Sequence, residues 1–294
     1  MAKIVIIGNS LAGFSCCEAL VKNSQDNEIT IIAQEKVPAY KAHLLTDFLK
    51  DEIEEKDIFL CDKDFYAKNK INFLKENKVY RIDTKKKLVV LKDNAKIGYD
   101  YLVIASGQKV NIPDIPGKTK DGVFAFYSFE DIKGIKDRLL LANAICIMGE
   151  ADLALRLAEI FLNKDKEVKI IEKIKPKVLP VSEKLEWIDA LELSEIIGDG
   201  AELKAIKLSN GKAIGVDLVL FVGNLIASTE FLKETDLQTE EGYVLVNDLF
   251  QTNFENIFSC GSVCRKQGLA EAKSWEIVVS EGQLVANQFL RNKF

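Results

Sequence analysis

The chain has 294 residues, of which 48% are hydrophobic and 29% charged, and its net charge is −5. This size and composition are typical of a globular protein of about two domains, and the acidic balance excludes a basic nucleic-acid-binding face. The longest apolar runs, such as 218–222, are far shorter than the roughly 20 residues of a membrane span, so we expect a cytoplasmic protein with no membrane or nucleic-acid partner.

A strand, a glycine-containing turn and a helix open the chain. Residues 3–7 predict a buried strand, and the turn Gly8-Asn9-Ser10-Leu11-Ala12-Gly13 leads into a helix over 12–22. A second buried strand over 28–33 ends near Glu35. This order within roughly 30 residues is that of a βαβ unit that binds a dinucleotide. Because the strand starts almost at once, we expect no signal peptide.

The next part of the chain alternates short elements. Residues 57–77 predict a helix and a short strand, and apolar and polar residues alternate over 78–104 as in a hairpin. The strand 101–105 stops at Ser106-Gly107, and the prolines and glycine of 113–117 mark a linker.

A second, altered copy of the first unit follows. A strand over 144–148 leads into the turn Gly149-Glu150-Ala151-Asp152-Leu153-Ala154, a helix over 151–163 and a strand over 167–171 that ends at Glu172. Beyond it we expect one short helix around 183–191.

The last part of the chain contains further strands and a helix. The tripeptide Ser209-Asn210-Gly211 predicts a tight hairpin between 203–208 and 212–214. A strand over 218–222 and the final segment 257–263 precede a closing helix of about 20 residues.

The six cysteines form no CxxC or CxxxxC pair, and there is a single histidine. This pattern excludes the usual zinc sites, so we expect no metal and mostly buried, reduced thiols. A redox-active dithiol formed by Cys260 and Cys264 stays open as an alternative.

Four segments together resemble one protein family. The turn 8–13 with Glu35, the strand end 101–107, the turn at Gly149 and the segment 252–263 are similar in order and type to the pyridine nucleotide–disulfide oxidoreductase superfamily. The resemblance is closest to rubredoxin-reductase and nitrite-reductase-like FAD flavoproteins. It implies an α/β fold of two nested Rossmann-like domains with parallel sheets and small antiparallel hairpins.

The resemblance also implies a domain organisation. Residues 1–110 and 226–294 form the FAD-binding domain, and residues 111–225 form an NAD(P)-binding-like domain that is pruned between 180 and 193. The family usually adds a C-terminal domain, which we expect this chain to lack.

The expected FAD site combines the first turn with later segments. Gly8 permits the tight turn, Gly13 lets helix and strand pack closely, and the helix N-terminus offers N–H groups to phosphates. Glu35 is placed to accept hydrogen bonds from the adenosine ribose. The resemblance assigns the following residues to FAD: Gly8, Ser10, Leu11, Ala12, Gly13, Glu35, Lys41, Val79, Ala105, Ser106, Gly107, Gly261, Ser262, Val263 and Trp275.

Some expected FAD neighbours depart from the family pattern. Ser262 stands where the family has an aspartate that binds the ribityl chain. Ala42 and His43 stand where the family has a basic residue and a proline against the flavin ring, so Lys41 and His43 are the candidate cationic neighbours of the flavin. Two alternatives stay open: His43 as a solvent-facing loop residue, and Trp275 as a core aromatic.

The expected NAD site matches the family pattern less well than the expected FAD site. Gly149, Ala151 and Glu172 occupy its main positions, but Glu150 and Asp152 place two carboxylates in the phosphate-binding turn. Glu172 suits a ribose hydroxyl and disfavours a 2′-phosphate, so NADH is expected rather than NADPH. Arg156 and the proline-free loop at 223–226 also depart from the family, and loss of nicotinamide binding stays equally open.

The resemblance implies an FAD-dependent oxidoreductase that passes electrons from NADH through the flavin to a small molecule or a redox protein, such as a rubredoxin-like electron carrier. The flavin itself carries the chemistry, and the missing CxxxxC pair argues against disulfide reduction. The alternative is an FAD-binding electron relay, or a non-catalytic flavoprotein, that has lost nicotinamide binding. A fold that binds neither dinucleotide also stays open.

Overall fold

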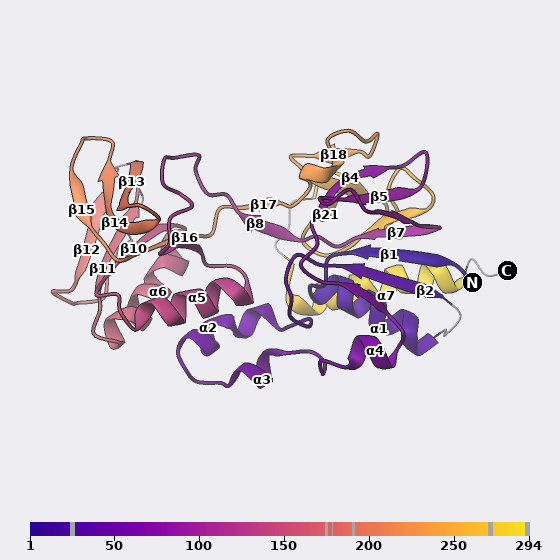
Figure 1. Ribbon diagram of the computed structural model, residues 1–294, viewed down its shortest axis with the longest axis horizontal. Helices are drawn as coiled ribbons and strands as arrows, with labels where there is room; N and C mark the ends of the chain where they lie inside the picture. Colours follow the sequence, from indigo (N-terminus) through magenta and orange to yellow (C-terminus); the bar gives the residue numbers. More distant parts are fainter. Residues whose placement is uncertain (24–26, 174–175, 178, 190–191, 270–272, 292–294) are drawn as a thin grey trace. The chain divides into compact units, whose positions relative to one another are not determined.

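The computed structural model describes residues 1–23, 27–173, 176–177, 179–189, 192–269 and 273–291 (Figure 1). The chain folds into two compact units. The first unit comprises Met1–Leu44, Glu54–Lys109 and Ile226–Phe294, and the second comprises Leu45–Ile53 and Val110–Leu225. Both are built around a parallel sheet, which confirms the predicted α/β class with nested units.

The central sheet of the first unit has the strand order β20-β7-β1-β2-β3, and all neighbouring pairs are parallel. Its strands read as near-continuous apolar runs because both faces are covered. Helices α1 (Leu11–Asn23) and α7 (Trp275–Arg291) lie side by side along one face (Figure 1). The strands are β1 (Lys3–Ile7), β2 (Glu28–Ile32), β3 (Asn72–Leu74), β7 (Tyr101–Ile104) and β20 (Ile257–Ser259).

Gly282 sets the close approach of these two helices. A Cβ atom at this position would lie 2.4 Å from the carbonyl oxygen of Ala12 and 3.0 Å from the backbone nitrogen of Cys16. Both atoms belong to the backbone of α1, so no side-chain movement relieves the overlap. The absence of a side chain at Gly282 therefore brings α7 directly onto the first helix.

Two small sheets and several short helices complete the first unit. The hairpin expected over 78–104 is the antiparallel sheet β4-β5-β6, followed by β7. The remaining elements are β4 (Val79–Asp83), β5 (Leu88–Leu91), β6 (Lys96–Gly98), β18 (Thr239–Glu240), β19 (Tyr243–Val246), β21 (Cys264–Lys266), η1 (Ala42–Leu44), α3 (Glu55–Ile58), α4 (Phe65–Lys68) and η2 (Glu230–Leu232). Strand β8 (Gln108–Val110) pairs with β17 (Leu225–Ala227).

The second unit repeats the parallel architecture, with the strand order β12-β11-β10-β16-β9. A separate antiparallel sheet, β13-β14-β15, contains the tight hairpin predicted at Ser209–Gly211. The elements are β9 (Val123–Ala125), α5 (Phe129–Leu139), β10 (Ala144–Gly149), α6 (Ala151–Asn163), β11 (Glu167–Glu172), β12 (Leu185–Asp189), β13 (Leu193–Asp199), β14 (Glu202–Leu208), β15 (Ala213–Gly215) and β16 (Leu218–Val222).

The prediction of a short helix around 183–191 is wrong. Residues 185–189 form strand β12, and residues 190–191 lie outside the described part of the chain. Strand β12 pairs in parallel with β11, with Val168 opposite Leu185. The Trp187 indole also donates a hydrogen bond to the Glu172 carbonyl at 3.2 Å. Pairing with an open sheet edge outweighs the local helix preference of this leucine- and glutamate-containing segment.

Residues 45–53, which include α2 (Leu45–Leu49), pack with the second unit although they lie within the expected domain 1–110. The Phe48 ring stacks on Phe129 with a centroid distance of 5.6 Å. Lys136 donates to the Phe48 carbonyl at 2.7 Å, and both Lys136 and Lys164 form ion pairs with Asp51. These contacts attach the segment to α5 and to the end of α6.

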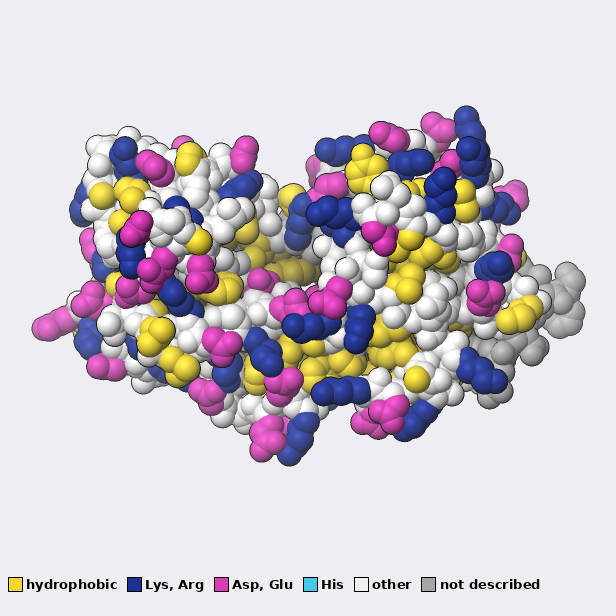
Figure 2. Space-filling view, viewed as in Figure 1, with side chains coloured by type: hydrophobic (Ala, Val, Ile, Leu, Met, Phe, Trp, Pro, Cys, Tyr) yellow, Lys and Arg dark blue, Asp and Glu magenta, His cyan; other side chains and the backbone are white. Residues whose placement is uncertain are grey.

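The surface shows no concentration of one charge sign on the face in Figure 2, where acidic and basic side chains alternate among the described residues. None of the described helices is both long and apolar enough to traverse a bilayer. Within the described ranges, no cluster of three or more potential metal-binding side chains occurs.

Candidate functional site

Three expected FAD segments meet at one edge of the first unit's sheet. Strands β1, β7 and β20 are parallel neighbours, so their carboxyl ends lie at the same edge. Gly8 follows the first strand, 105–107 follows the second, and Gly261 lies two residues beyond the third. Ligands of open parallel sheets bind at this kind of edge.

The first turn is tight because of its glycines. Gly8 has φ +110°, and a Cβ there would lie 2.1 Å from the Ala105 carbonyl oxygen. A Cβ at Gly13 would lie 2.1 Å from the Gly8 carbonyl oxygen. Helix α1 therefore begins at Leu11 directly beside the strand ends, where its first N–H groups can receive an anion.

Two polar side chains of this turn have protein partners. The Ser10 hydroxyl donates to the Ala105 carbonyl at 3.4 Å, which ties the turn to the end of β7. The Asn9 side-chain oxygen accepts a hydrogen bond from the Tyr66 hydroxyl at 3.0 Å. Burial raises the pKa of Tyr66, so the hydroxyl stays protonated and acts as the hydrogen-bond donor to Asn9. Sequence reasoning missed Tyr66, because no local pattern links it to the turn.

Glu35 lies just beyond β2, at the position expected for a ribose ligand. Its two carboxylate oxygens are 3.0 and 3.2 Å from the Tyr40 hydroxyl, which donates to them. Nearby, the Asn77 N–H donates to the Ala33 carbonyl at 2.9 Å and holds the start of β4, where Val79 is buried, against the end of β2. The Tyr40 contact orients the Glu35 carboxylate.

The closing segment, residues 257–266, lies against the first helix at Gly261. Gly261 has φ +81°, and a Cβ there would be 2.8 Å from the Ala12 Cβ. The Ser259 hydroxyl and the Cys260 N–H both donate hydrogen bonds to the Ile104 carbonyl, at 2.9 and 3.1 Å. Gly261 and Ala12, which are far apart in the sequence, are thus in direct proximity.

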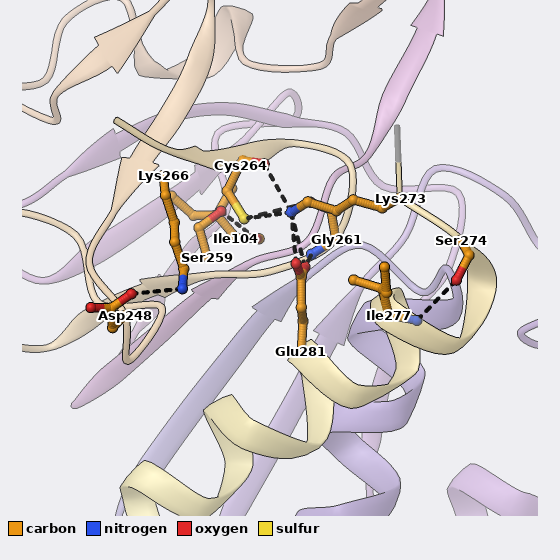
Figure 3. Close-up of polar contacts among 10 residues, drawn as sticks. All are labelled: Ile104, Asp248, Ser259, Gly261, Cys264, Lys266, Lys273, Ser274, Ile277 and Glu281. Atoms are coloured by element: carbon orange, nitrogen blue, oxygen red, sulfur yellow. Dashed lines mark hydrogen bonds and ion pairs between the residues drawn. The ribbon is translucent and has the colours of Figure 1, made fainter. Parts of the chain in front are cut away.

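Behind this segment lies an ion pair that sequence reasoning missed (Figure 3). The Lys273 ammonium is 2.9 Å from a carboxylate oxygen of Glu281; the Glu281 side chain is buried and that of Lys273 is largely buried. The eight-residue separation of the pair crosses a loop and the start of α7, and thus follows no helical or strand spacing.

The expected ring neighbours His43 and Trp275 contact each other. Their rings are stacked, with centroids 5.5 Å apart and an interplanar angle of 23°. Trp275 is 50% exposed, which excludes the alternative of a core aromatic. The Lys41 ammonium donates to the Asp57 carbonyl at 3.2 Å. A stacked and accessible aromatic pair offers a flat surface to a planar ligand.

The expected NAD turn has the same backbone form in the second unit. Gly149 ends β10 with φ +124°, and α6 begins at Ala151. A Cβ at Gly223 would lie 2.8 Å from a carboxylate oxygen of Glu150, so this side chain covers the neighbouring loop. Glu172 ends β11 and accepts a hydrogen bond from the Lys173 N–H at 2.8 Å.

The cysteine thiols are poor nucleophiles in this fold. All six are free, and five of them are buried. Burial raises the pKa of Cys260, and burial likewise raises the pKa of Cys264 to about 11. Both therefore stay protonated at neutral pH, which disfavours the dithiol alternative.

The whole chain resembles known redox proteins. The family model for pyridine nucleotide-disulphide oxidoreductase matches residues 2–276. NADH-rubredoxin oxidoreductase from Clostridium acetobutylicum is 30% identical over 270 residues, which cover 90% of this chain and 69% of that protein. Nitrite reductase [NAD(P)H] from Bacillus subtilis is 28% identical over 288 residues, which cover 91% of this chain but only 35% of that protein.

Solved structures show the same fold. The crystal structure of NADH:rubredoxin oxidoreductase from Clostridium acetobutylicum has a TM-score of 0.76 and 25% identity over 98% of this chain and 74% of that chain. A putidaredoxin reductase–putidaredoxin complex has a TM-score of 0.84 at 18% identity, over 98% and 75% of the two chains. With its family match, its paired glycine turns and its strand order, the chain belongs to the pyridine nucleotide–disulphide oxidoreductase family.

Proposed function

We propose that the first unit binds FAD and that the protein is an FAD-dependent oxidoreductase. The observation that carries the proposal is the convergence of Gly8, Ala105 and Gly261 at the carboxyl ends of three adjacent parallel strands. The backbone approaches so closely there that side chains at Gly8 and Gly261 would overlap their neighbours. Such a cradle fits an extended dinucleotide better than a compact metabolite.

Each part of the cradle matches a part of FAD. The N–H groups at the start of α1 bind the pyrophosphate, and Glu35 binds the adenosine ribose. Ser262 would offer a hydroxyl to the ribityl chain, and the His43–Trp275 stack and Lys41 would be the neighbours of the flavin ring. When bound, FAD supplies the electron-transfer chemistry. The chain's own groups bind it, orient it and set its electrostatic environment.

The electron donor we propose is NADH, and the acceptor is a protein electron carrier or a small molecule. The similarity to NADH-rubredoxin oxidoreductase supports a rubredoxin-like partner. Glu172 at the end of β11 favours a free ribose hydroxyl over a 2′-phosphate, which supports NADH. The free thiols agree with a reducing compartment, and we propose a cytoplasmic location.

A second candidate function is an FAD-binding relay that no longer accepts electrons from a nicotinamide. The position of Glu150 favours it, because this carboxylate covers Gly223 beside the turn that would receive the pyrophosphate. Asp152 adds a second exposed carboxylate in the first turn of α6. A diphosphate at that turn would meet like charge.

A visible spectrum followed by anaerobic addition of NADH separates these functions. The purified protein should show flavin absorption bands, and NADH should bleach them if the dehydrogenase function is correct. Bands that persist after NADH addition would favour the relay. Reconstitution with FAD that yields no bound flavin would refute both.

Neutralising the second turn tests its charge directly. We expect Glu150→Gln with Asp152→Asn to tighten NADH binding by about threefold to tenfold, because two like charges near the diphosphate are removed while side-chain volume is kept. Glu159→Gln with Glu183→Gln, at exposed sites elsewhere in the unit, is the control and should leave affinity unchanged. Equal affinities measured by calorimetry for all three proteins would show that charge is not the obstacle.

A further inference from the structure

The Lys273–Glu281 pair is unusual because both charges are largely shielded from water. The side chains are only 16% and 8% exposed, and the ammonium lies 2.9 and 3.0 Å from the two carboxylate oxygens. Burial of an ion pair is unfavourable unless each charge is fully satisfied by close partners. The other hydrogen-bond partners of the two side chains therefore indicate what the buried pair does.

Those partners all belong to the closing segment. One Glu281 carboxylate oxygen accepts the Gly261 N–H at 2.7 Å, and the Lys273 ammonium donates to the carbonyls of Gly261 at 2.9 Å and Cys264 at 3.0 Å (Figure 3). The ammonium's three protons are thereby accounted for by two carbonyls and one carboxylate. Both the N–H and the carbonyl of Gly261 are held from behind.

The residue that follows Gly261 takes no part in these contacts. Ser262 is half-buried, and within the described part of the chain neither its N–H nor its hydroxyl has a hydrogen-bond partner. The following residue, Val263, is anchored through its carbonyl, which accepts the Val244 N–H at 3.0 Å. Ser262 is therefore presented by a turn that is fixed on both sides.

We propose that the Lys273–Glu281 pair is a positioning device for the FAD-binding turn, which it holds so that Ser262 offers its N–H and hydroxyl to the ribityl chain. The inference rests on the proposed FAD function. Because Ser262 has no charge, it contributes to binding only through hydrogen-bond geometry, and that geometry depends on the orientation of the Gly261 peptide groups. The buried pair supplies this orientation.

Two ligands distinguish positioning from general stabilisation. ADP contains the pyrophosphate and adenosine that meet the first turn and Glu35, but it lacks the ribityl and flavin groups that meet Ser262. We expect Lys273→Met to raise the Kd of the deflavinated protein for FAD by about tenfold or more, the loss expected for a charge-supported hydrogen bond. The Kd for ADP should stay within about twofold.

Milder variants and a matched control complete the experiment. Glu281→Gln keeps an acceptor for the Gly261 N–H and should weaken FAD binding less than Lys273→Met does. Lys273→Arg keeps the positive charge and should also retain more FAD affinity than Lys273→Met. The control is Lys266→Met, which breaks the exposed Lys266–Asp248 pair of 2.7 Å in the same segment and should change neither Kd (Figure 3). If Lys273→Met fails to fold, Glu281→Gln and Lys273→Arg provide the same comparison.

The outcomes separate the two proposals. Wild-type protein that binds ADP but no FAD would refute the FAD function itself. Wild-type protein that binds FAD, with the folded variants binding it equally well, would overturn only the positioning role. Parallel loss of FAD and ADP affinity would also overturn it, since the pair would then act through the stability of the whole unit.

Discussion

Replacing Gly282 by alanine should separate the two helices that support the proposed cofactor site. The added methyl group would lie 2.4 Å from the Ala12 carbonyl oxygen, whereas ordinary van der Waals contact begins at 3.4 Å. The helices must therefore move apart by about 1 Å, or the overlap persists. Both contacting atoms are backbone atoms, so a rotamer change cannot relieve the overlap.

The expected loss of stability follows from two opposing effects. Alanine in a helix interior is favoured over glycine by about 1 kcal/mol. Overpacking a well-filled interface costs about 1–3 kcal/mol, and an overlap between two backbones falls at the upper end of this range. The net destabilisation is about 2 kcal/mol, which corresponds to a decrease in Tm of roughly 4–8 °C for a domain of this size.

Tryptophan fluorescence can follow this change in the first unit alone. The chain has two tryptophans, Trp275 at the start of α7 and Trp187 in β12 of the second unit. In a Trp187→Phe background, thermal unfolding monitored by fluorescence reports on the first unit. Ser280→Ala, at an exposed site on the same helix, is the control and should leave Tm nearly unchanged. An increase in Tm for Gly282→Ala would refute the close helix contact.

Two further predictions concern the second unit. Hydrogen bonds from Lys136 and Lys164 hold the pKa of Asp51 below its ordinary value, so its stabilising effect is complete above the unfolded pKa near 4 and is lost as pH falls through the folded pKa. Asp51→Asn should therefore lower the urea midpoint at pH 7, with the two proteins converging in acid; a constant difference at all pH values would contradict this. Asp217 accepts hydrogen bonds from the N–H groups of residues 143 and 144 at 2.8 and 2.9 Å, so Asp217→Ala should lower the free energy of unfolding by about 1–3 kcal/mol. The control Asp114→Ala removes an exposed ion pair and should lower it by less than about 0.5 kcal/mol. Equal urea midpoints for these last two variants would contradict the structural role of Asp217.

The central strands could be predicted from sequence because burial on both faces produces continuous apolar runs. The strands 3–7 and 218–222 have this pattern, and a glycine turn or a polar residue marks where each parallel strand ends. Strand β12 could not be predicted in this way, because it lies at a sheet edge and its pairing with β11 decides its structure. Its short leucine- and glutamate-containing sequence fits a helix equally well.

The candidate site was predictable only where a backbone requirement selects a residue type. Gly8 and Gly261 are such positions, because a side chain would overlap the neighbouring segment. The Tyr66–Asn9 hydrogen bond and the Lys273–Glu281 ion pair join residues at separations that no repeating pattern identifies. Contacts of this kind depend on the assembled topology and become visible only in three dimensions.

The position of β20 in the chain has a consequence for biosynthesis. This strand completes the first unit's sheet beside β7, yet residues 110–225, the larger part of the second unit, are synthesised between them. Until residues 257–259 emerge, β7 presents an unpaired edge that is open to aggregation or chaperone binding. The turn at Gly261 follows directly, so a ribosome-bound chain cannot assemble the proposed cofactor cradle until residues 257–261 have emerged. Binding of a cofactor in this cradle therefore requires that the whole second unit has already been synthesised.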